Sequence, residues 1–197
     1  MDSMSSTSQK LVKSRNISTQ NLVLVGMFAA VLAIISQISI PLPTGVPITI
    51  QLFGIALVGT VLGWKLGCLA AIVYILLGCV GLPVFSNFQG GIQRLTGMTG
   101  GYILAWPVMA ALSGVRVRHP KQWVCQAASI AFAVAGLMVV ELVGAFQWSV
   151  LTSEMSFSAI MAYSFAVFIP KDFVLTVLAV FVGGQIRKSL VKTGCLK

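Results

Sequence analysis

The sequence predicts an all-α membrane protein with six transmembrane helices and with both termini in the cytoplasm. Hydrophobic residues make up 57% of the 197 residues, and the mean hydropathy is +0.97. Only 9% of the residues are charged, whereas soluble domains carry about 25%. The apolar residues also occur in runs close to the roughly 20 residues that a helix needs to cross a bilayer core about 30 Å thick.

Six apolar runs are candidate spans. They cover residues 21–40, 48–63, 66–82, 99–113, 123–148 and 157–186. The last run is too long for one straight span, and Pro170 interrupts it. The residue before a proline is pushed out of the helical region, while proline suits the first helical position. We therefore expect a short apolar segment and then a helix from Pro170, although the short segment could be a crossing of its own and give seven spans.

The distribution of Lys and Arg favours six spans. With the N-terminus inside, the inner segments hold all 13 basic residues except Arg94 and Lys171, in agreement with the positive-inside rule. These inner residues are Lys10, Lys13, Arg15, Lys65, Arg116, Arg118, Lys121, Arg187, Lys188, Lys192 and Lys197. Seven spans would place the basic tail outside. We expect a flexible basic cytoplasmic N-terminal segment (1–20), a six-helix substrate-binding membrane domain (21–188) and a basic cytoplasmic tail (189–197).

Several kinds of chemistry find no support in the sequence. The four cysteines are scattered, with no CxxC pair, and the single histidine lies in a basic inner loop, so no metal site is predicted. The GxxxxGK[ST], HExxH and GxSxG motifs are absent, so the chain does not by itself hydrolyse ATP and is not expected to be an enzyme. We predict no catalytic residue and no cofactor. Most of the basic residues behind the net charge of +9 lie in the predicted inner segments, so this charge does not indicate a nucleic-acid partner.

A polar, glycine-rich break at residues 81–102, GLPVFSNFQGGIQRLTGMTGGY, separates two apolar runs. It holds Arg94, one of the two basic residues left on the outer side. The other, Lys171, is next to Asp172 at the start of the last helix. Arg94 could simply reach the lipid headgroups, and Asp172 could interact with the positive end of the helix dipole. Lys171 opposes that dipole, so a neighbouring carboxylate or an anionic ligand is needed to offset it.

Other polar residues on the outer side could contact a ligand. Three prolines between residues 41 and 47 predict a rigid non-helical loop, after which Thr49 and Gln51 stand at the head of the second span. These uncharged groups suit a small polar ligand, or they cap the helix. Glu141 lies inside the fifth span, where ionisable residues are often functional. It could serve a binding site or a hydrogen bond between helices.

Ala29 and Ala33 are four residues apart on one face of the first helix. Such small-xxx-small spacing permits close approach of another helix. The partner helix could belong to another subunit or to this chain.

Several motifs together resemble the BioY family, the biotin-specific S components of energy-coupling factor (ECF) transporters. They are PITIQLFG, GLPVF followed by a Gly-Gly pair, and TGGY, and the resemblance spans nearly the whole chain. It implies a multi-pass protein of the cell membrane that binds the vitamin near the outer face, under the first and third outer loops. It also implies a transmembrane scaffold subunit and a pair of ATPases as partners, with Ala29 and Ala33 at the scaffold interface.

The resemblance also implies a set of substrate-binding residues. Together with the charges discussed above, the predicted set is Thr49, Gln51, Phe85, Asn87, Gly90, Gly91, Arg94, Tyr102, Lys171 and Asp172. The chain departs from the family at two positions: Met98 replaces a proline before TGGY, and Leu175 replaces a lysine three residues after the aspartate. Burying the biotin carboxylate unpaired would cost several kcal/mol. We therefore expect Lys171 or Arg94 to supply the missing cation, and Asn87, Gln51 and Asp172 to contact the ureido ring.

The predicted function is capture of biotin at the outer face and its delivery inward together with an energy-coupling module. One alternative is an S component for another small vitamin or for a biotin precursor, since Leu175 replaces the usual lysine. The other is an autonomous membrane carrier, for which inverted repeats or charges along a pore are expected. The sequence shows no convincing repeat.

Overall fold

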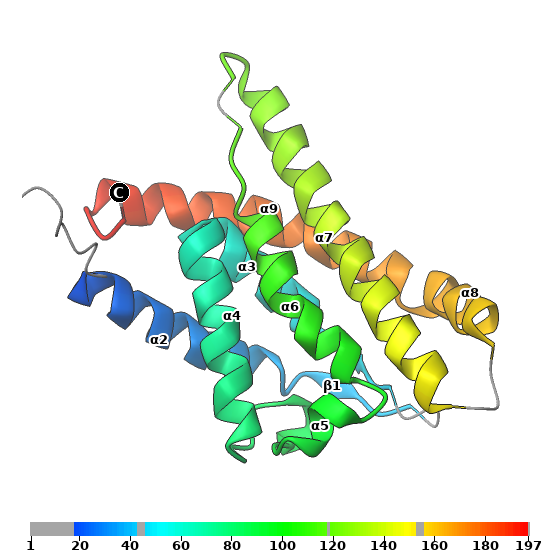
Figure 1. Cartoon of the computed structure of the whole chain (residues 1–197). Coiled ribbons are helices and arrows are strands. Elements are labelled where there is room, and N and C mark those ends of the chain that lie inside the picture. The colour runs from blue at the N-terminus through cyan, green and yellow to red at the C-terminus, as the bar shows by residue number, and fades with distance from the viewer. Residues whose placement is uncertain (1–17, 43–45, 118, 153–155, 197) are drawn as a thin grey trace, which may run out of the picture.

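The protein is mostly helical, in agreement with the predicted class (Figure 1). The computed structural model describes residues 18–42, 46–117, 119–152 and 156–196, so most of the predicted segment 1–20 lies outside the described residues. Two short strands, β1 (Ser39–Ile40) and β2 (Ile48–Thr49), pair antiparallel. The α-helices are α2 (Thr19–Ile35), α3 (Gln51–Leu62), α4 (Trp64–Cys79), α5 (Gln93–Thr96), α6 (Gly100–Ser113), α7 (Gln122–Leu151), α8 (Phe157–Val167) and α9 (Ile169–Lys192).

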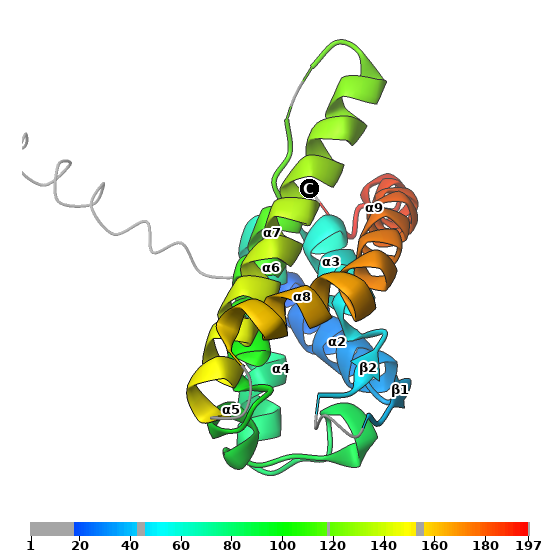
Figure 2. The ribbon, with the colours of Figure 1, turned by 90° about the vertical axis from the view of Figure 1, so that its right-hand side faces the viewer.

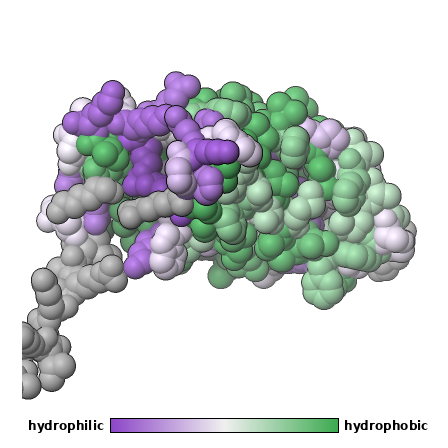
Figure 3. Space-filling model, turned by 90° about the horizontal axis from the view of Figure 1, so that it is seen from above, coloured by the Kyte–Doolittle hydropathy of each residue, from purple (hydrophilic) through white to green (hydrophobic). Residues whose placement is uncertain are grey.

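Among these helices, α7 and α9 are long and apolar enough to cross a membrane, while the remaining apolar helices have 17 residues or fewer. Large apolar side chains stay exposed on several helices, as in Leu76 of α4, Phe146 of α7 and Val174 of α9. Figure 3 shows one face that is largely hydrophobic, with hydrophilic residues gathered toward the end where α9 finishes. These features agree with a membrane protein, and the six-span arrangement remains a prediction.

The helix boundaries differ from the predicted spans at the first outer loop. The first predicted span, 21–40, stops at Ile35, because its last residues form β1 and pair with β2. The Ser36 hydroxyl donates to the carbonyls of Ala33 and Val84 at 2.8 and 2.5 Å, so the chain leaves the helix where it meets the loop after α4. Figure 2 shows both strands at the same end of the molecule as that loop.

The predicted break before Pro170 is confirmed. Helix α8 ends at Val167 and α9 begins at Ile169, with Pro170 in its first turn. At the other end α9 continues to Lys192, and Leu196 is buried in the core. The predicted boundary between a membrane domain and a tail at residue 189 therefore falls inside a continuous helix.

The core forms where α6 packs against α3, α4 and α7 (Figure 1). Small residues allow this close packing: a methyl group at Gly59 of α3 would collide with the Ala110 carbonyl of α6, and one at Gly67 of α4 would collide with Gly59. Ala29 of α2 is 1% exposed, and Ala33 packs partly buried against the same core. Ala29 therefore packs inside this chain, while a role of Ala33 at the interface with another subunit remains a prediction.

Basic residues gather at the C-terminal end of α3. At its C-terminal end, Lys65, Arg116 and Arg187 line a groove. Arg116 donates to the Thr60 carbonyl at 3.4 Å, and Arg187 donates to the Val61 carbonyl. These acceptors lie in the last turn of α3, where carbonyl groups lack a helical partner. Burial and the nearby Arg187 lower the pKa of Arg116 to about 10, so it stays charged at neutral pH.

We predict that Gly59→Ala destabilises the protein by about 1–3 kcal/mol, since the added methyl group overpacks the contact between α3 and α6. Gly184→Ala is a matched control, because a methyl group at this helical position meets no atom within 4 Å. It should be neutral or slightly stabilising, as alanine favours a helix by up to about 1 kcal/mol. Thermal unfolding of both variants in detergent measures the difference. Equal midpoints would contradict the packing argument.

Candidate ligand-binding site

A cavity lies at the end of α3 opposite the basic groove. The start of α3, the loop after α4, α5, α6, α7 and the junction of α8 and α9 all contribute to it. The empty space among its lining residues is about 630 Å³, which includes the part that is open to the outside. Small molecules bind at such concave sites, where a mostly apolar lining holds a few convergent polar groups.

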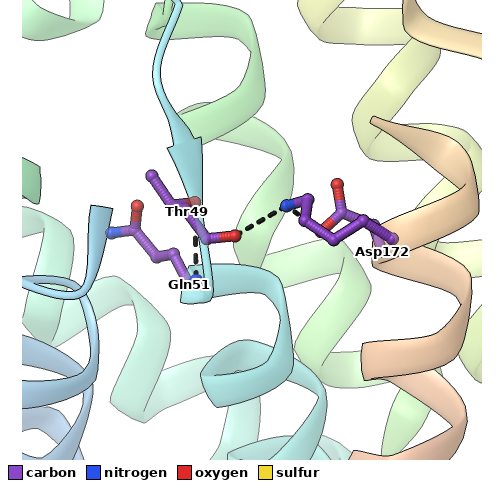
Figure 4. Close-up of polar contacts among 4 residues, drawn as sticks. Thr49, Gln51 and Asp172 are labelled. Carbon is purple, nitrogen blue, oxygen red and sulfur yellow. Dashed lines mark hydrogen bonds and ion pairs between the residues drawn. The ribbon is translucent and has the colours of Figure 1, made fainter. Parts of the chain in front are cut away.

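Lys171 joins α9 to the loop between α2 and α3 at this cavity. The Lys171 ammonium group lies 2.6 Å from a carboxylate oxygen of Asp172 and donates to the Thr49 carbonyl at 2.6 Å. Figure 4 shows Thr49 and Asp172 on either side of this contact. Asp172 is only 3% exposed and lies in the first turn of α9. The pair therefore supplies the neighbouring carboxylate that Lys171 needs at a helix N-terminus.

A chain of hydrogen bonds connects the cavity to the loop after α4. The Gln51 side-chain amide donates to the Tyr74 hydroxyl at 2.5 Å, and this hydroxyl donates to the Val84 carbonyl at 2.9 Å. Gln51 is buried at the start of α3, where the Thr49 hydroxyl also accepts its backbone N–H (Figure 4). The amide nitrogen of Gln51 is thus engaged in the protein itself.

Aromatic rings form one wall of the cavity. The Phe85 ring packs edge-on against Tyr74 with centroids 5.6 Å apart, and Trp106 lies 5.8 Å from Tyr74. Phe85 occupies the space beside Gly78, where a larger residue would collide with its ring. Both Phe85 and Trp106 line the cavity. This wall offers an apolar surface to a ring or an aliphatic chain.

Arg94 enters the cavity from α5. The Gln147 amide of α7 holds this short helix by donating to the carbonyls of Leu95 and Gly97 at 2.8 Å each. Arg94 is half-buried, and in the part of the chain that the structure describes its guanidinium group makes no hydrogen bond or ion pair. Burial lowers the pKa of Arg94. Burying the positive charge of Arg94 is unfavourable, and an anion bound in the cavity would offset this penalty.

The predicted site residues divide into two groups. Thr49, Gln51, Phe85, Arg94, Tyr102, Lys171 and Asp172 line this cavity together. Asn87, Gly90 and Gly91 do not, and their contacts explain why. Asn87 has a left-handed backbone (φ 58°) and accepts a hydrogen bond from Ser39 at 3.0 Å. Gly91 (φ 98°) donates from its backbone to Gly78, and Gly90 lies against the Leu82 carbonyl. These three residues shape the loop.

Helical spacing in the sequence indicates some lining residues that lie outside the predicted set. Trp106 lies one turn after Tyr102 on α6, and Phe168 lies one turn before Asp172, and residues four apart share a helix face. Glu141, whose role was left open, also lines the cavity. Met98 and Leu175, at which the resemblance predicts a departure from the family, are not among the lining residues.

The chain is similar to several known transporters. It is 34% identical to "Probable biotin transporter BioY" of Pyrococcus horikoshii over 167 residues, which is 83% of this chain and 94% of that protein. It is also 34% identical to "Biotin transporter BioY" of Thermotoga maritima over 169 residues, covering 86% and 96% of the two chains. These relatives are named as transporters, in agreement with the prediction that the chain is not an enzyme.

Among solved structures, the fold matches a crystal structure of the S-component for biotin from an ECF-type ABC transporter. The TM-score is 0.74, the identity is 25%, and the match covers 88% of this chain and 95% of that one. A family model also matches residues 6–192, and its description is "BioY family". The chain therefore belongs to the BioY family.

Proposed function

We propose that the chain is the membrane-embedded S component that captures biotin at the outer face and delivers it inward with an energy-coupling module. The observation that carries this proposal is the cavity, which combines an aromatic wall, a buried carboxylate and an unpaired arginine in one space. Biotin has matching parts: an apolar ring and chain, a ureido group with two N–H donors, and a carboxylate. The names of the relatives support the choice of ligand.

We further propose six spans with both termini in the cytoplasm. The described basic residues Lys65, Arg116 and Arg187 meet at one end of α3, while Arg94 and Lys171 lie at the cavity around its other end. The positive-inside rule places the basic groove in the cytoplasm. The cavity then opens toward the outside, where a capture subunit meets its substrate.

Within this cavity, we assign the biotin carboxylate to Arg94 in preference to Lys171. The Lys171 ammonium group already has the Asp172 carboxylate and the Thr49 carbonyl as partners, each at 2.6 Å. The guanidinium group of Arg94 can bind a carboxylate with two parallel hydrogen bonds. The ureido ring then lies deeper, toward Asp172, and the aromatic wall contacts the ring and the chain between them.

Delivery requires partners, because the chain has no ATP-hydrolysing motif. We propose a transmembrane scaffold subunit and a pair of ATPases, as the resemblance implies. Contact with the scaffold through Ala33 is compatible with its partial burial, whereas Ala29 is enclosed by the chain. The exposed small residues Gly26 and Ala30 lie beside them on α2 and would complete such a face.

Equilibrium binding of radiolabelled biotin to the purified chain, without ATP, tests the proposed function. Nanomolar affinity is expected for a capture subunit, and uptake into vesicles should require the ATPase pair. Absence of biotin binding, together with tight binding of another vitamin or of a biotin precursor, would support the alternative S component. Uptake by the chain alone at the full rate would support an autonomous carrier.

Loss of Arg94 should weaken biotin binding selectively. A hydrogen bond to a charged group contributes about 1.5–3 kcal/mol, so Arg94→Ala is expected to lower the affinity by about 10- to 100-fold. Biotin amide, which lacks the negative charge, should lose much less. Arg116→Ala, at the opposite end of α3, is the control and should leave biotin affinity unchanged. An equal loss for the acid and the amide would argue against this pairing.

Loss of Lys171 should instead reduce stability. Lys171→Met leaves the Asp172 carboxylate buried without its cation, which we expect to cost about 1–3 kcal/mol. The double variant Lys171→Met/Asp172→Asn removes the unpaired charge and should recover most of the unfolding midpoint. If the single variant keeps the midpoint but loses affinity for biotin and not for its amide, Lys171 binds the ligand carboxylate and our assignment to Arg94 is wrong.

A further inference from the structure

Glu141 is a buried acidic residue that the fold does not explain. It lies on α7, is 2% exposed and lines the cavity. Among the described residues its oxygen Oε2 has no hydrogen-bond partner. The chain has four acidic residues, of which Asp2 and Glu154 lie outside the described ranges. The other two, Glu141 and Asp172, both face this one space.

A purely structural carboxyl group would have partners within the protein. Buried polar groups are almost always hydrogen-bonded, since leaving one unpaired is costly. Around Glu141 this requirement is not met: the hydroxyl groups of Tyr102 on α6 and Ser164 on α8 are also buried without a well-aligned hydrogen bond in the described part of the chain, although Ser164 lies within reach of both Tyr102 and Glu141. Both adjoin Glu141, and Tyr102 also lines the cavity. A hydroxyl group has one proton, so Ser164 can satisfy at most one oxygen of Glu141. The carboxyl group of Glu141 therefore keeps an acceptor for a donor from a ligand in the cavity.

The geometry of a cyclic urea determines how many acceptors a binding site must provide. The two N–H groups of a cyclic urea flank its carbonyl and point to opposite sides of the ring. A single carboxylate on one side cannot accept both, so two acceptors on different elements are needed. Asp172 on α9 and Glu141 on α7 are the two carboxyl groups of the cavity. Lys171 lies near both of them and contacts Asp172 directly.

We propose that Glu141 is a specificity-determining residue that accepts one ring N–H of the ureido group, while Asp172 accepts the other. The Tyr102 hydroxyl lies close enough to both carboxylates to interact with them, and it donates to the ring carbonyl. This assignment rests on the proposed function, because it places the ureido end of biotin at the inner side of the cavity. It assigns a role to Glu141, for which the sequence allows either a binding site or a hydrogen bond between helices.

Two variants and two ligands test the assignment by equilibrium binding. The ligands are biotin and its cyclic guanidine analogue, in which C=NH replaces the ring C=O and which is cationic at neutral pH. Glu141→Leu removes the acceptor and should weaken biotin binding about 10- to 100-fold. Glu141→Gln keeps an acceptor oxygen but no charge. It should weaken binding of the cationic analogue at least about 10-fold more than that of biotin, because only an ionised carboxylate favours the cation.

The controls separate recognition from folding. Ser113→Ala removes another buried hydroxyl without a partner, at the far end of α6, and should change neither affinity. If both Glu141 variants bind both ligands as the wild type does, or lose both ligands equally along with a lowered unfolding midpoint, Glu141 is structural and the assignment is overturned. If the wild-type chain fails to bind biotin at all, the proposed function fails, and this inference fails with it.

Discussion

The contact of Lys171 with Asp172 and Thr49 is the interaction on which the cavity depends. It joins the first turn of α9 to β2, elements more than a hundred residues apart in the chain. Because β2 leads directly into α3, the same contact sets the position of Gln51 and, through Tyr74, of the loop after α4. Without it, a lysine at a helix N-terminus and a buried aspartate would both be unfavourable. The contacts of Lys171 thus hold α9, the start of α3 and the loop after α4 in place around the cavity.

The glycine-rich break at residues 81–102 has two roles that its composition does not separate. The backbone of Asn87 and of Gly91 is left-handed, a conformation that glycine adopts freely. Gly90 lies so close to the Leu82 carbonyl that a side chain would collide with it. Arg94 and Tyr102, further along, face the cavity. Glycines and amides favour tight turns and ligand contact alike, so sequence spacing could not tell the first group from the second.

The sequence predicted well those features that depend on local physics. Apolar runs indicated the helices, and the steric effect of Pro170 located the break between α8 and α9. Prediction failed where distant partners decide the outcome: α2 ends at Ile35 because the following residues pair with β2 and meet Val84. For the same reason the spacing of Ala29 and Ala33 could not show that Ala29 is buried in the core of this chain.

Charge balance connects the architecture of the cavity with selectivity. Its lining holds two cations, Arg94 and Lys171, and two carboxyl groups, Glu141 and Asp172. The charges of Lys171 and Asp172 neutralise each other, which leaves the charges of Arg94 and Glu141 for the ligand. A simple fatty acid could pair with Arg94, but it would leave Glu141 without a donor, and discrimination against such ligands comes from polar groups that they leave unpaired. A ligand that carries a carboxylate at one end and N–H donors at the other satisfies both groups at once.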